Sequence, residues 1–328
     1  MTWFDALTGF VEQSGDDVRS KLHLNGSKLH SSVNNRSFDA GSFSTPSLSS
    51  LRSKTVSGNG SQIRIAELVG DVRSLHQDAA NANAVFQVAS QFNCLEMAAP
   101  EVVPEDGVGI YQNDRTQGPA CSISAGAGTI YRNYFTDVNG RTGQTRDNQI
   151  DCLKDIEHHF GGDLWRMENG YCFPTSSGLA YIERQLANSR RQELDDIRAK
   201  LSVGVQSKTQ VTIGDATHLV TQVFCSALPV SYSDIRESEW NYFPRLILDA
   251  TYEATFHVAA QNFIDTGCPK LYLTLVGGGV FGNKLDWIFA SMSRSLDLFA
   301  WANLDVSIVS YGSSKPEVVS FLAHQHAG

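Results

Sequence analysis

Short apolar segments alternate with longer segments of helical periodicity from residue 62 onward, and this alternation constrains the fold more than any other feature. Near-continuous apolar segments indicate buried strands at 84–89, 219–227, 271–276 and 304–310. Helices are expected between and beside them, at 119–135, 148–160, 177–188, 189–201, 242–265 and 284–299. Strands that alternate with helices predict an α/β layer fold with a largely covered sheet.

The first sixty residues have a different pattern. A short amphipathic segment at 2–11 precedes two alternating segments that flank Asn25-Gly26, a strong hairpin signal. Residues 42–60 are rich in Ser, Gly and Thr and predict a connector, with a short helix after Pro46. We therefore predict two units, namely a helix and β-hairpin extension with its connector over 1–60, and an α/β domain over 61–328.

The composition limits which classes of binding partner and which cellular compartment we expect for this protein. With 26 Lys and Arg against 35 Asp and Glu, the net charge is −9, which argues against an extended nucleic-acid-binding surface. No apolar segment is long enough for a membrane span, and the N-terminus, which carries Asp5, lacks the basic region of a secretory signal. The six cysteines include no C-x-x-C pair, so we expect reduced thiols in a cytoplasmic or nuclear protein without a metal site or resident cofactor.

A glycine-rich loop follows the strand expected at 271–276. It reads Gly277-Gly278-Gly279-Val280-Phe281-Gly282-Asn283 and leads into a helix. Glycines let the backbone approach an anion, and free N–H groups at a helix N-terminus point at it. The spacing also matches G-x-G-x-x-G, but only one strand remains after it, so a complete Rossmann domain does not fit. The loop therefore predicts a phosphate-binding site, and the alternative is a turn packed tightly against the sheet.

Polar residues follow the strand expected at 84–89. Gln91, Asn93 and Glu96 come directly after it, and ligands in open α/β sheets bind beyond the carboxyl ends of strands. These side chains are thus placed to offer two amides and a carboxylate to a ligand. Turn formation and capping are their alternative roles.

Cys121 supports a different hypothesis. It is expected in the first turn of a helix, where the helix dipole lowers the pKa of a thiol. Gln117-Gly118 before it resembles the nucleophile segment of papain-like hydrolases. Such an enzyme also needs a His base, and no flanking pattern marks one of the nine His. A cysteine-dependent hydrolase or transferase therefore stays an alternative function.

Three segments resemble one protein family. Gly70-Asp71-Val72 looks like the Gly-Asp-Ile/Val element of macro domains, and 84–93 resembles their ribose-binding strand. The segment 277–282 is similar to the diphosphate loop of macro domains of the poly(ADP-ribose) glycohydrolase type. The order of the three segments along the chain also agrees with that family.

The resemblance implies a three-layer α/β/α domain with a mixed sheet, to which a small β-rich extension is added at the N-terminus. It implies that Asp71 accepts a hydrogen bond from the adenine amine beside the backbone of Val72, and that Asn93 contacts the distal ribose. The residues implied to surround the diphosphate and its ribose are Gly277, Gly278, Gly279, Val280, Phe281, Gly282 and Asn283. The implied partner is ADP-ribose or an ADP-ribosylated protein.

The catalytic segment departs from the family. Glycohydrolases of this type place two adjacent glutamates after a first glycine-rich loop, and residues 94–121 contain neither feature. Hydrolysis of a glycosidic bond needs a proton donor beside the leaving oxygen, so Glu96 is the first candidate and Asp114 the second, with Asn93 at the ribose. The expected function is ADP-ribose binding with hydrolysis of ADP-ribosyl conjugates, and a non-catalytic ADP-ribose reader is the alternative.

Overall fold

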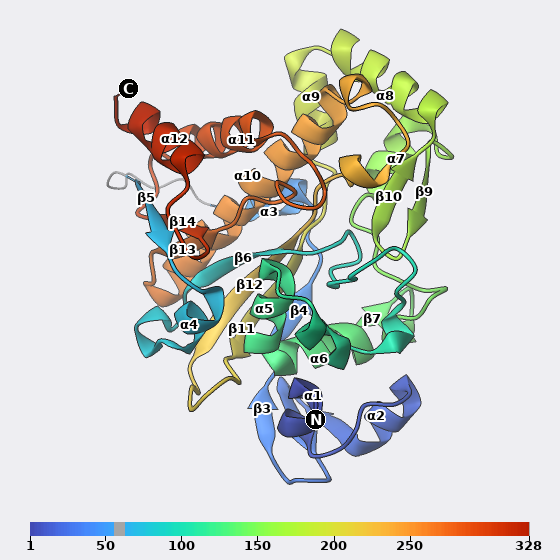
Figure 1. Ribbon diagram of the computed structural model, residues 1–328, viewed down its shortest axis with the longest axis vertical. Helices are drawn as coiled ribbons and strands as arrows, with labels where there is room; N and C mark the ends of the chain where they lie inside the picture. The colour runs from blue at the N-terminus through green and yellow to red at the C-terminus, as the bar shows by residue number, and fades with distance from the viewer. Residues whose placement is uncertain (56–62, 328) are drawn as a thin grey trace.

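A mixed sheet forms the centre of the computed structural model, which describes residues 1–55 and 63–327 (Figure 1). In order across the sheet, the strands are β4 (Ser42–Ser44), β11 (Gly204–Gln210), β12 (Leu219–Cys225), β6 (Val85–Ala89), β13 (Lys270–Leu273), β14 (Asp305–Ser310) and β5 (Arg64–Val69). From β12 to β5 all neighbours are parallel, whereas β11 is antiparallel to both β4 and β12. The carboxyl ends of the five parallel strands therefore share one edge of the sheet.

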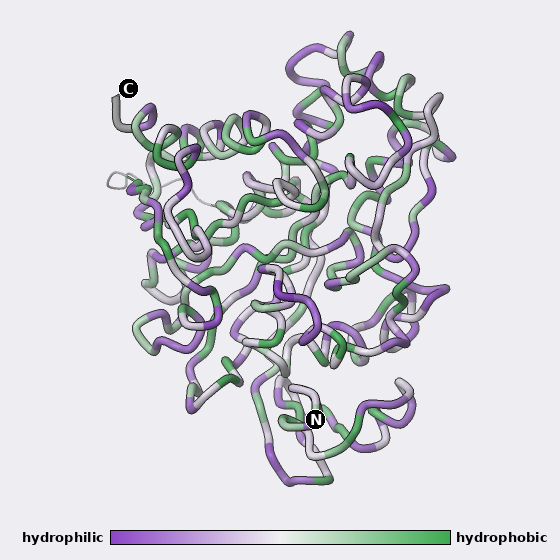
Figure 2. Tube along the Cα trace, viewed as in Figure 1, coloured by the Kyte–Doolittle hydropathy of each residue, from purple (hydrophilic) through white to green (hydrophobic). Residues whose placement is uncertain are grey.

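Helices cover both faces of this sheet (Figure 1). One face carries α3 (Leu48–Lys54), α10 (Tyr242–Thr266), α11 (Leu285–Leu298) and α12 (Pro316–Ala327), with α8 (Ser176–Asn188) and α9 (Arg191–Arg198) packed on α10. The other face carries α4 (Val72–Gln77), α5 (Gln117–Ser124) and α6 (Gly126–Tyr134). Hydrophobic residues follow the inner strands, and hydrophilic residues concentrate on outer turns (Figure 2). The predicted three-layer α/β/α fold is confirmed.

One predicted helix is divided in two. The segment 119–135 forms α5 and α6, which meet at Ala125, where φ is −122° and ψ is 58°. Gly126 and Gly128 follow the break, and a Cβ on either would lie 2.6 Å from a side-chain atom, of Trp3 and of Thr209 respectively. The two glycines are therefore sites of close packing against the N-terminal segment and the sheet.

Two hairpins were not predicted, although the sequence carries their signal. β7 (Asp137–Val138) and β8 (Arg141–Thr142) are joined by Asn139-Gly140. β9 (Trp165–Glu168) and β10 (Tyr171–Pro174) are joined by Asn169-Gly170. All four turn residues have positive φ, as a type I′ turn requires. The helix expected at 148–160 begins only at α7 (Lys154–Phe160).

The N-terminal extension packs against the main domain. Its elements are α1 (Trp3–Thr8), α2 (Gly15–Lys21), β1 (Leu22–Asn25), β2 (Lys28–Ser31) and β3 (Ser37–Asp39). The hairpin at Asn25-Gly26 is confirmed, since Asn25 pairs with Lys28. The extension shares a hydrophobic cluster with α5, α6 and η3 (Gly109–Asn113). In Figure 1, α5 and α6 lie directly above it.

The predicted connector contributes to the main domain. Its helix is confirmed as α3, which packs on α10, whereas the strand β4 at the edge of the main sheet was not expected. The predicted boundary at residue 60 lies outside the described residues. Within the described residues, no helix combines the length and hydropathy that crossing a bilayer requires.

Candidate functional site

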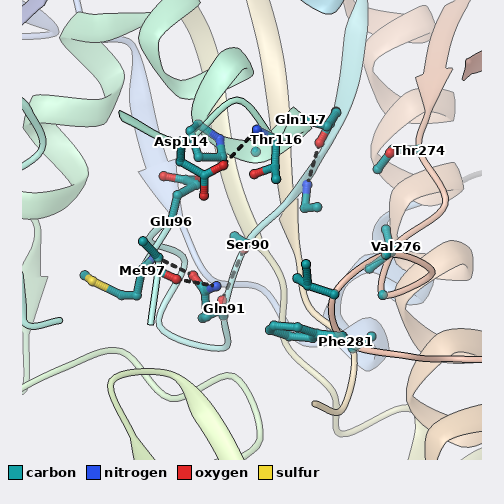
Figure 3. A pocket seen from close by; sticks show the side chains of 18 of the residues that line it. Ser90, Gln91, Glu96, Met97, Asp114, Thr116, Gln117, Thr274, Val276 and Phe281 are labelled. Carbon is teal, nitrogen blue, oxygen red and sulfur yellow. Dashed lines mark hydrogen bonds between the residues drawn. The ribbon is translucent and has the colours of Figure 1, made fainter. Parts of the chain in front are cut away.

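A cavity of about 490 Å³ lies at the carboxyl ends of β6, β12 and β13 (Figure 3). Three adjacent parallel strands deliver their following residues to this edge, which is where ligands bind in open α/β sheets. The volume falls in the range of small-molecule sites. The cavity is lined by Ala89, Ser90, Gln91, Glu96, Met97, Ala98, Asp114, Thr116, Gln117, Gly118, Pro119, Tyr171, Ala227, Tyr232, Thr274, Leu275, Val276, Gly277, Gly279, Val280 and Phe281.

The glycine-rich loop forms one side of the cavity. Gly277 and Gly282 have φ of +75° and +71°, which side chains other than glycine rarely adopt. A Cβ on Gly277 would also overlap the Cβ of Ala227. The Asn283 amide fixes the base of the loop, because its Nδ2 donates to the carbonyl of Leu228 at 2.8 Å. This side chain and those glycines shape the loop that presents Phe281 to the cavity.

Several amides of this loop remain available for a ligand. Gly278 N–H donates within the loop to Leu275, and Gly282 N–H donates to Gly279. By contrast, among the hydrogen bonds of the described residues, the N–H groups of Gly279, Val280 and Phe281 donate to no protein group. Consecutive free N–H groups make a concave site for an anion. No Lys or Arg is among the residues that line the cavity, so backbone amides are the groups there that can neutralise a phosphate.

A closed turn after β6 positions Glu96. Gln91 closes it with its side-chain amide, which accepts from Met97 N at 2.7 Å and donates to Met97 O at 3.0 Å. Asn93 also serves the turn, since its Oδ1 accepts from Leu95 N at 3.0 Å and its Nδ2 donates to Gln149 at 2.8 Å. Asn93 is fully buried and does not line the cavity, so the structure does not bring it to a ligand there.

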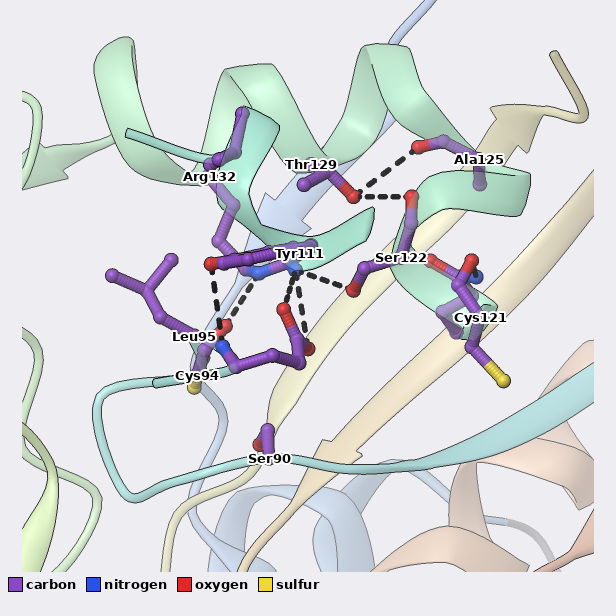
Figure 4. A network of polar contacts seen from close by, with 12 residues as sticks. Ser90, Cys94, Leu95, Tyr111, Cys121, Ser122, Ala125, Thr129 and Arg132 are labelled. Carbon is purple, nitrogen blue, oxygen red and sulfur yellow. Dashed lines mark hydrogen bonds and ion pairs between the residues drawn. The ribbon is translucent and has the colours of Figure 1, made fainter. Parts of the chain in front are cut away.

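Glu96 pairs with a buried arginine, Arg132, whose other polar contacts Figure 4 shows. Arg132 of α6 places Nη2 at 3.2 Å from Glu96 Oε2, and both side chains are almost completely removed from solvent. The same guanidinium donates to Ser122 Oγ at 3.0 Å and to the carbonyl of Cys94. The hydroxyl of Tyr111 accepts from the Glu96 N–H at 3.3 Å. Glu96 is therefore held by contacts to its backbone and to its carboxylate.

The environment of Glu96 suits proton transfer. Burial raises the pKa of the Glu96 carboxyl to about 7, although the charge of Arg132 and the hydroxyl of Ser122 act in the opposite direction. At neutral pH this carboxyl therefore exists in both protonation states, which is the condition under which a carboxyl can donate or accept a proton most effectively.

The raised pKa of Glu96 predicts how stability depends on pH. The folded state holds this proton more tightly than the unfolded state, whose carboxyl titrates near 4.5. Protonation of Glu96 thus stabilises the folded state fully below pH 4.5. This stabilisation, which amounts to about 3 kcal/mol, is lost as pH rises to about 7. Urea denaturation of the wild type and of Glu96→Gln measures it. The free energy of unfolding of Glu96→Gln minus that of the wild type should increase across this window, and a constant difference would contradict the raised pKa.

Aromatic side chains form a second wall of the cavity. Tyr171 of β10 and Tyr232 of η4 (Val230–Tyr232) surround Phe281, with ring centroids 5.4 to 5.6 Å apart. The Tyr171 hydroxyl donates to the carbonyl of Met97 at 2.6 Å, which links this wall to the turn that holds Glu96. The sequence prediction included Phe281 but missed both tyrosines. The Asn169-Gly170 hairpin signal would have placed Tyr171 on a strand.

The N-terminus of α5 opens into the cavity. Asp114 lies just before it, and its carboxylate accepts from Thr116 N at 2.8 Å. Figure 3 shows Asp114 and Glu96 on the same side of the cavity, away from Thr274 and Val276. Gln117 fixes the helix to β6, because its Oε1 accepts from Ala89 N at 2.9 Å.

Cys121 does not have the properties of a nucleophile, so that prediction is wrong. The thiol is fully buried and does not line the cavity. It lies in the second turn of α5 rather than the first. Burial raises its pKa well above the usual value, which is opposite to the expected effect of the helix dipole. Gln117 donates to Sγ at 3.2 Å, as a packed core contact.

The structure brings together only part of the predicted site. Glu96, Asp114 and the loop residues Gly277, Gly279, Val280 and Phe281 line one cavity. Gly278, Gly282 and Asn283 are not among the residues that line it. Asp71 caps α4, where its carboxylate accepts from Arg73 N at 2.8 Å, and Val72 is buried in that helix. Neither lines the cavity, and α4 packs beside α5.

Arg132 is the main residue that sequence reasoning missed. It is the only charged residue between 116 and 134. A lone cation in a helix whose neighbours are apolar or small indicates a buried partner, because a buried charge is nearly always paired. Among the described residues, no group of three or more His, Cys, Asp and Glu side chains is arranged to hold a metal ion.

Among the comparisons with known proteins, only the one with solved structures found similar proteins. The sequence matches no protein-family model and no curated protein. The chain is similar to the poly(ADP-ribose) glycohydrolase of Thermomonospora curvata, with a TM-score of 0.45, 12% identity and coverage of 95% of this chain and 96% of that one. It is also similar to the poly(ADP-ribose) glycohydrolase of Deinococcus radiodurans in complex with ADP-ribose, with a TM-score of 0.43, 10% identity and coverage of 87% and 92%. Similarity at this level does not transfer an activity.

Proposed function

We propose that this protein binds ADP-ribose or a related nucleotide in the cavity and hydrolyses ADP-ribosyl bonds. One observation carries the proposal. Gly279, Val280 and Phe281, whose N–H groups donate to no protein group among the described residues, line the same cavity as the buried Glu96. An anion site and a group with a pKa near 7 are the two features that this reaction requires. The identity of the nucleotide comes from the motifs at 70–72, 84–93 and 277–282.

In the proposed complex, the diphosphate lies against the amides of Gly279, Val280 and Phe281. Backbone N–H groups neutralise it, so an acidic protein can bind it without Lys or Arg. The aromatic wall covers the adjoining ribose, and the distal ribose extends toward Glu96. The adenine extends beyond the cavity toward the start of α4, where Asp71 and Val72 would recognise it.

The proposed reaction uses Glu96 as general acid. Its protonated carboxyl donates to the glycosidic oxygen as the bond from that oxygen to C1 of the distal ribose breaks. A water molecule adds to C1 and loses a proton, for which Asp114, on the same side of the cavity as Glu96, is the proposed acceptor. The products are ADP-ribose and the free hydroxyl of a cytoplasmic or nuclear acceptor protein, with atoms and charges balanced.

A non-catalytic reader is the second candidate, and one observation favours it. The Glu96 side chain is only 1% exposed and is paired with Arg132. A carboxylate that stays in this pair would not reach a glycosidic oxygen. The reader and the enzyme share the same ligand and differ only in turnover.

Two measurements test the proposal in sequence. Isothermal titration calorimetry with ADP-ribose should detect binding, and absence of heat at millimolar ligand would reject both forms of the proposal. Incubation with a serine-ADP-ribosylated peptide and with poly(ADP-ribose) then separates the two. Release of ADP-ribose supports the enzyme, whereas binding without release supports the reader.

A pair of glycine variants tests the diphosphate loop. In Gly277→Ala, the new Cβ must accept φ of +75° and an overlap with Ala227. Strain of this kind costs about 1–3 kcal/mol, so ADP-ribose affinity should fall about tenfold to a hundredfold. Gly312→Ala is the matched control, because Gly312 also has a positive φ, of +78°, but does not line the cavity. Equal affinity in both variants would show that the shape of this loop does not determine binding.

A further inference from the structure

Glu12 links the N-terminal extension to two elements of the main domain. It lies between α1 and α2, and its side chain is partly buried. Oε2 accepts from Gly109 N at 2.6 Å, and Oε1 accepts from Val108 N at 2.9 Å. Oε1 also accepts from the hydroxyl of Tyr134 at 2.7 Å. One carboxylate thus joins the start of η3 to the end of α6.

The main-domain loop is shaped around this carboxylate. A Cβ on Gly107 would lie 2.6 Å from Glu12 Oε2, and a Cβ on Gly109 would lie 2.7 Å from it. Both positions therefore need glycine for the carboxylate to reach the backbone. Trp3 of the same extension adds a bond, since its Nε1 donates to the carbonyl of Val108 at 3.0 Å.

The two elements that Glu12 joins carry the two large side chains that hold Glu96. Tyr111 of η3 contacts the Glu96 backbone N–H at 3.3 Å. Arg132 of α6, two residues before Tyr134, pairs with the Glu96 carboxylate at 3.2 Å. The spacing of η3 from α6 therefore sets where Tyr111 and Arg132 lie around Glu96.

The carboxylate is not needed merely to attach the extension. The extension already contributes six buried apolar side chains to the cluster shared with α5, α6 and η3, namely Phe4, Leu7, Val18, Leu22, Leu29 and Phe38. Burial of Glu12 raises its pKa, which shows that placing a carboxylate here is unfavourable in itself. Hydrogen bonds to an ionised acceptor add directional restraint that apolar packing does not supply.

We propose that Glu12 is a positioning residue, and that the N-terminal extension fixes η3 against α6 so that Tyr111 and Arg132 hold Glu96 at the cavity. The inference rests on the proposed function for the meaning of Glu96. It assigns to residues 1–39 a role in the geometry of the site rather than in ligand contact.

Glu12→Gln tests this proposal in the full-length chain. The amide keeps the size of the side chain but has only one acceptor oxygen, whereas the carboxylate has two. It therefore cannot accept from both the Gly109 N–H and the Tyr134 hydroxyl as the carboxylate does. Asp16→Asn is the matched control, because Asp16 is an exposed acid of the same extension whose side-chain partner among the described residues is Arg19. Hydrogen–deuterium exchange of 106–113, ¹³C-detected titration of the Glu96 carboxyl, ADP-ribose affinity and turnover are measured for each.

In Glu12→Gln, exchange of 106–113 should accelerate about tenfold to a hundredfold, and the titration of Glu96 should shift. Turnover should fall about tenfold or more while ADP-ribose affinity stays within about threefold. Unchanged exchange and unchanged Glu96 titration would overturn the proposal. A similar change in Asp16→Asn would also overturn it.

Two further outcomes are separated by this design. If the wild type releases no ADP-ribose, the proposed hydrolysis fails, whereas exchange and Glu96 titration still decide whether Glu12 positions the site. If Glu12→Gln does not fold, Tyr134→Phe replaces it, since that variant removes only the bond between α6 and Glu12. Unchanged Glu96 titration in folded Tyr134→Phe would then overturn the proposal.

Discussion

Glu96→Gln is expected to lower the release of ADP-ribose by a factor of about 10²–10⁴ while ADP-ribose affinity is retained. The amide has nearly the shape of the carboxyl and can still accept from Arg132, but it has no acidic proton to give to the leaving oxygen. Binding should persist because the free amides of 279–281 belong to the loop on the other side of the cavity. Single-turnover release and calorimetry measure the two quantities separately.

The stability of the same variant relative to the wild type should increase as pH rises from about 4.5 to about 7, because burial makes ionisation of Glu96 unfavourable in the folded state and glutamine does not ionise. The variant also leaves the buried Arg132 without its carboxylate, so urea denaturation at the assay pH serves as the control that a loss of activity is not unfolding. In the wild type, kcat/KM should decrease as pH rises through about 7, because the acid form is lost. A Glu96→Gln rate within threefold of the wild type would remove Glu96 from the mechanism, and Asp114→Asn would then be the next variant to measure.

Secondary structure was predicted well in those elements whose buried residues recur at a regular spacing along the sequence. β6 and β12 are buried along nearly their whole length, so their sequences are short apolar segments. Buried and half-buried residues alternate along β14, and α10 ends at Gly267, where φ is +75°. β4 was missed because three residues at the sheet edge carry no such pattern. The hairpins at Asn139-Gly140 and Asn169-Gly170 were also missed, although the same dipeptide was used to predict the hairpin at Asn25-Gly26.

Only those parts of the site were predicted whose position follows from one continuous segment of sequence. The loop at 277–283 has a strand before it, a helix after it and glycines within it, so its position was predictable. Glu96 followed from the rule that ligands bind at the carboxyl ends of strands. The same rule placed Asn93 at the ligand, but the side chain satisfies the turn instead. Turn closure and ligand contact use the same residue types, and only tertiary structure separates them.

The neighbours of Glu96 depend on contacts between distant segments. Tyr111 lies 15 residues away in sequence and Arg132 lies 36 away. Cys121 illustrates the opposite case, in which a local rule predicts a lowered pKa and the surrounding core reverses it. The helix dipole acts within one turn and contributes at most about 2 kcal/mol, whereas burial of a thiolate without a partner costs more.

Arg132→Met is expected to lower the free energy of unfolding by about 3–5 kcal/mol at pH 8. Methionine fills much of the volume, but the variant leaves the Glu96 carboxylate buried without a cation and the carbonyl of Cys94 without its donor. Loss of the positive charge should raise the pKa of Glu96 further, since Arg132 is the largest opposing influence on it. The destabilisation should therefore shrink as pH falls toward 6, where the carboxyl takes up a proton, and urea denaturation at both pH values measures it.

The double variant Arg132→Met/Glu96→Gln separates the charge from the packing. If the unpaired carboxylate causes most of the loss, neutralising it should recover about half or more of the stability at pH 8, and the two substitutions should be strongly non-additive. The carbonyl of Cys94 stays without its donor in the double variant, so recovery should be incomplete by about 1–3 kcal/mol. Additive effects would instead show that Arg132 acts through its other contacts, which are the carbonyl of Cys94, the hydroxyl of Ser122 and the ring of Phe224, and not through Glu96. Because the cycle measures only unfolding, it tests the pair that holds Glu96 independently of any ligand.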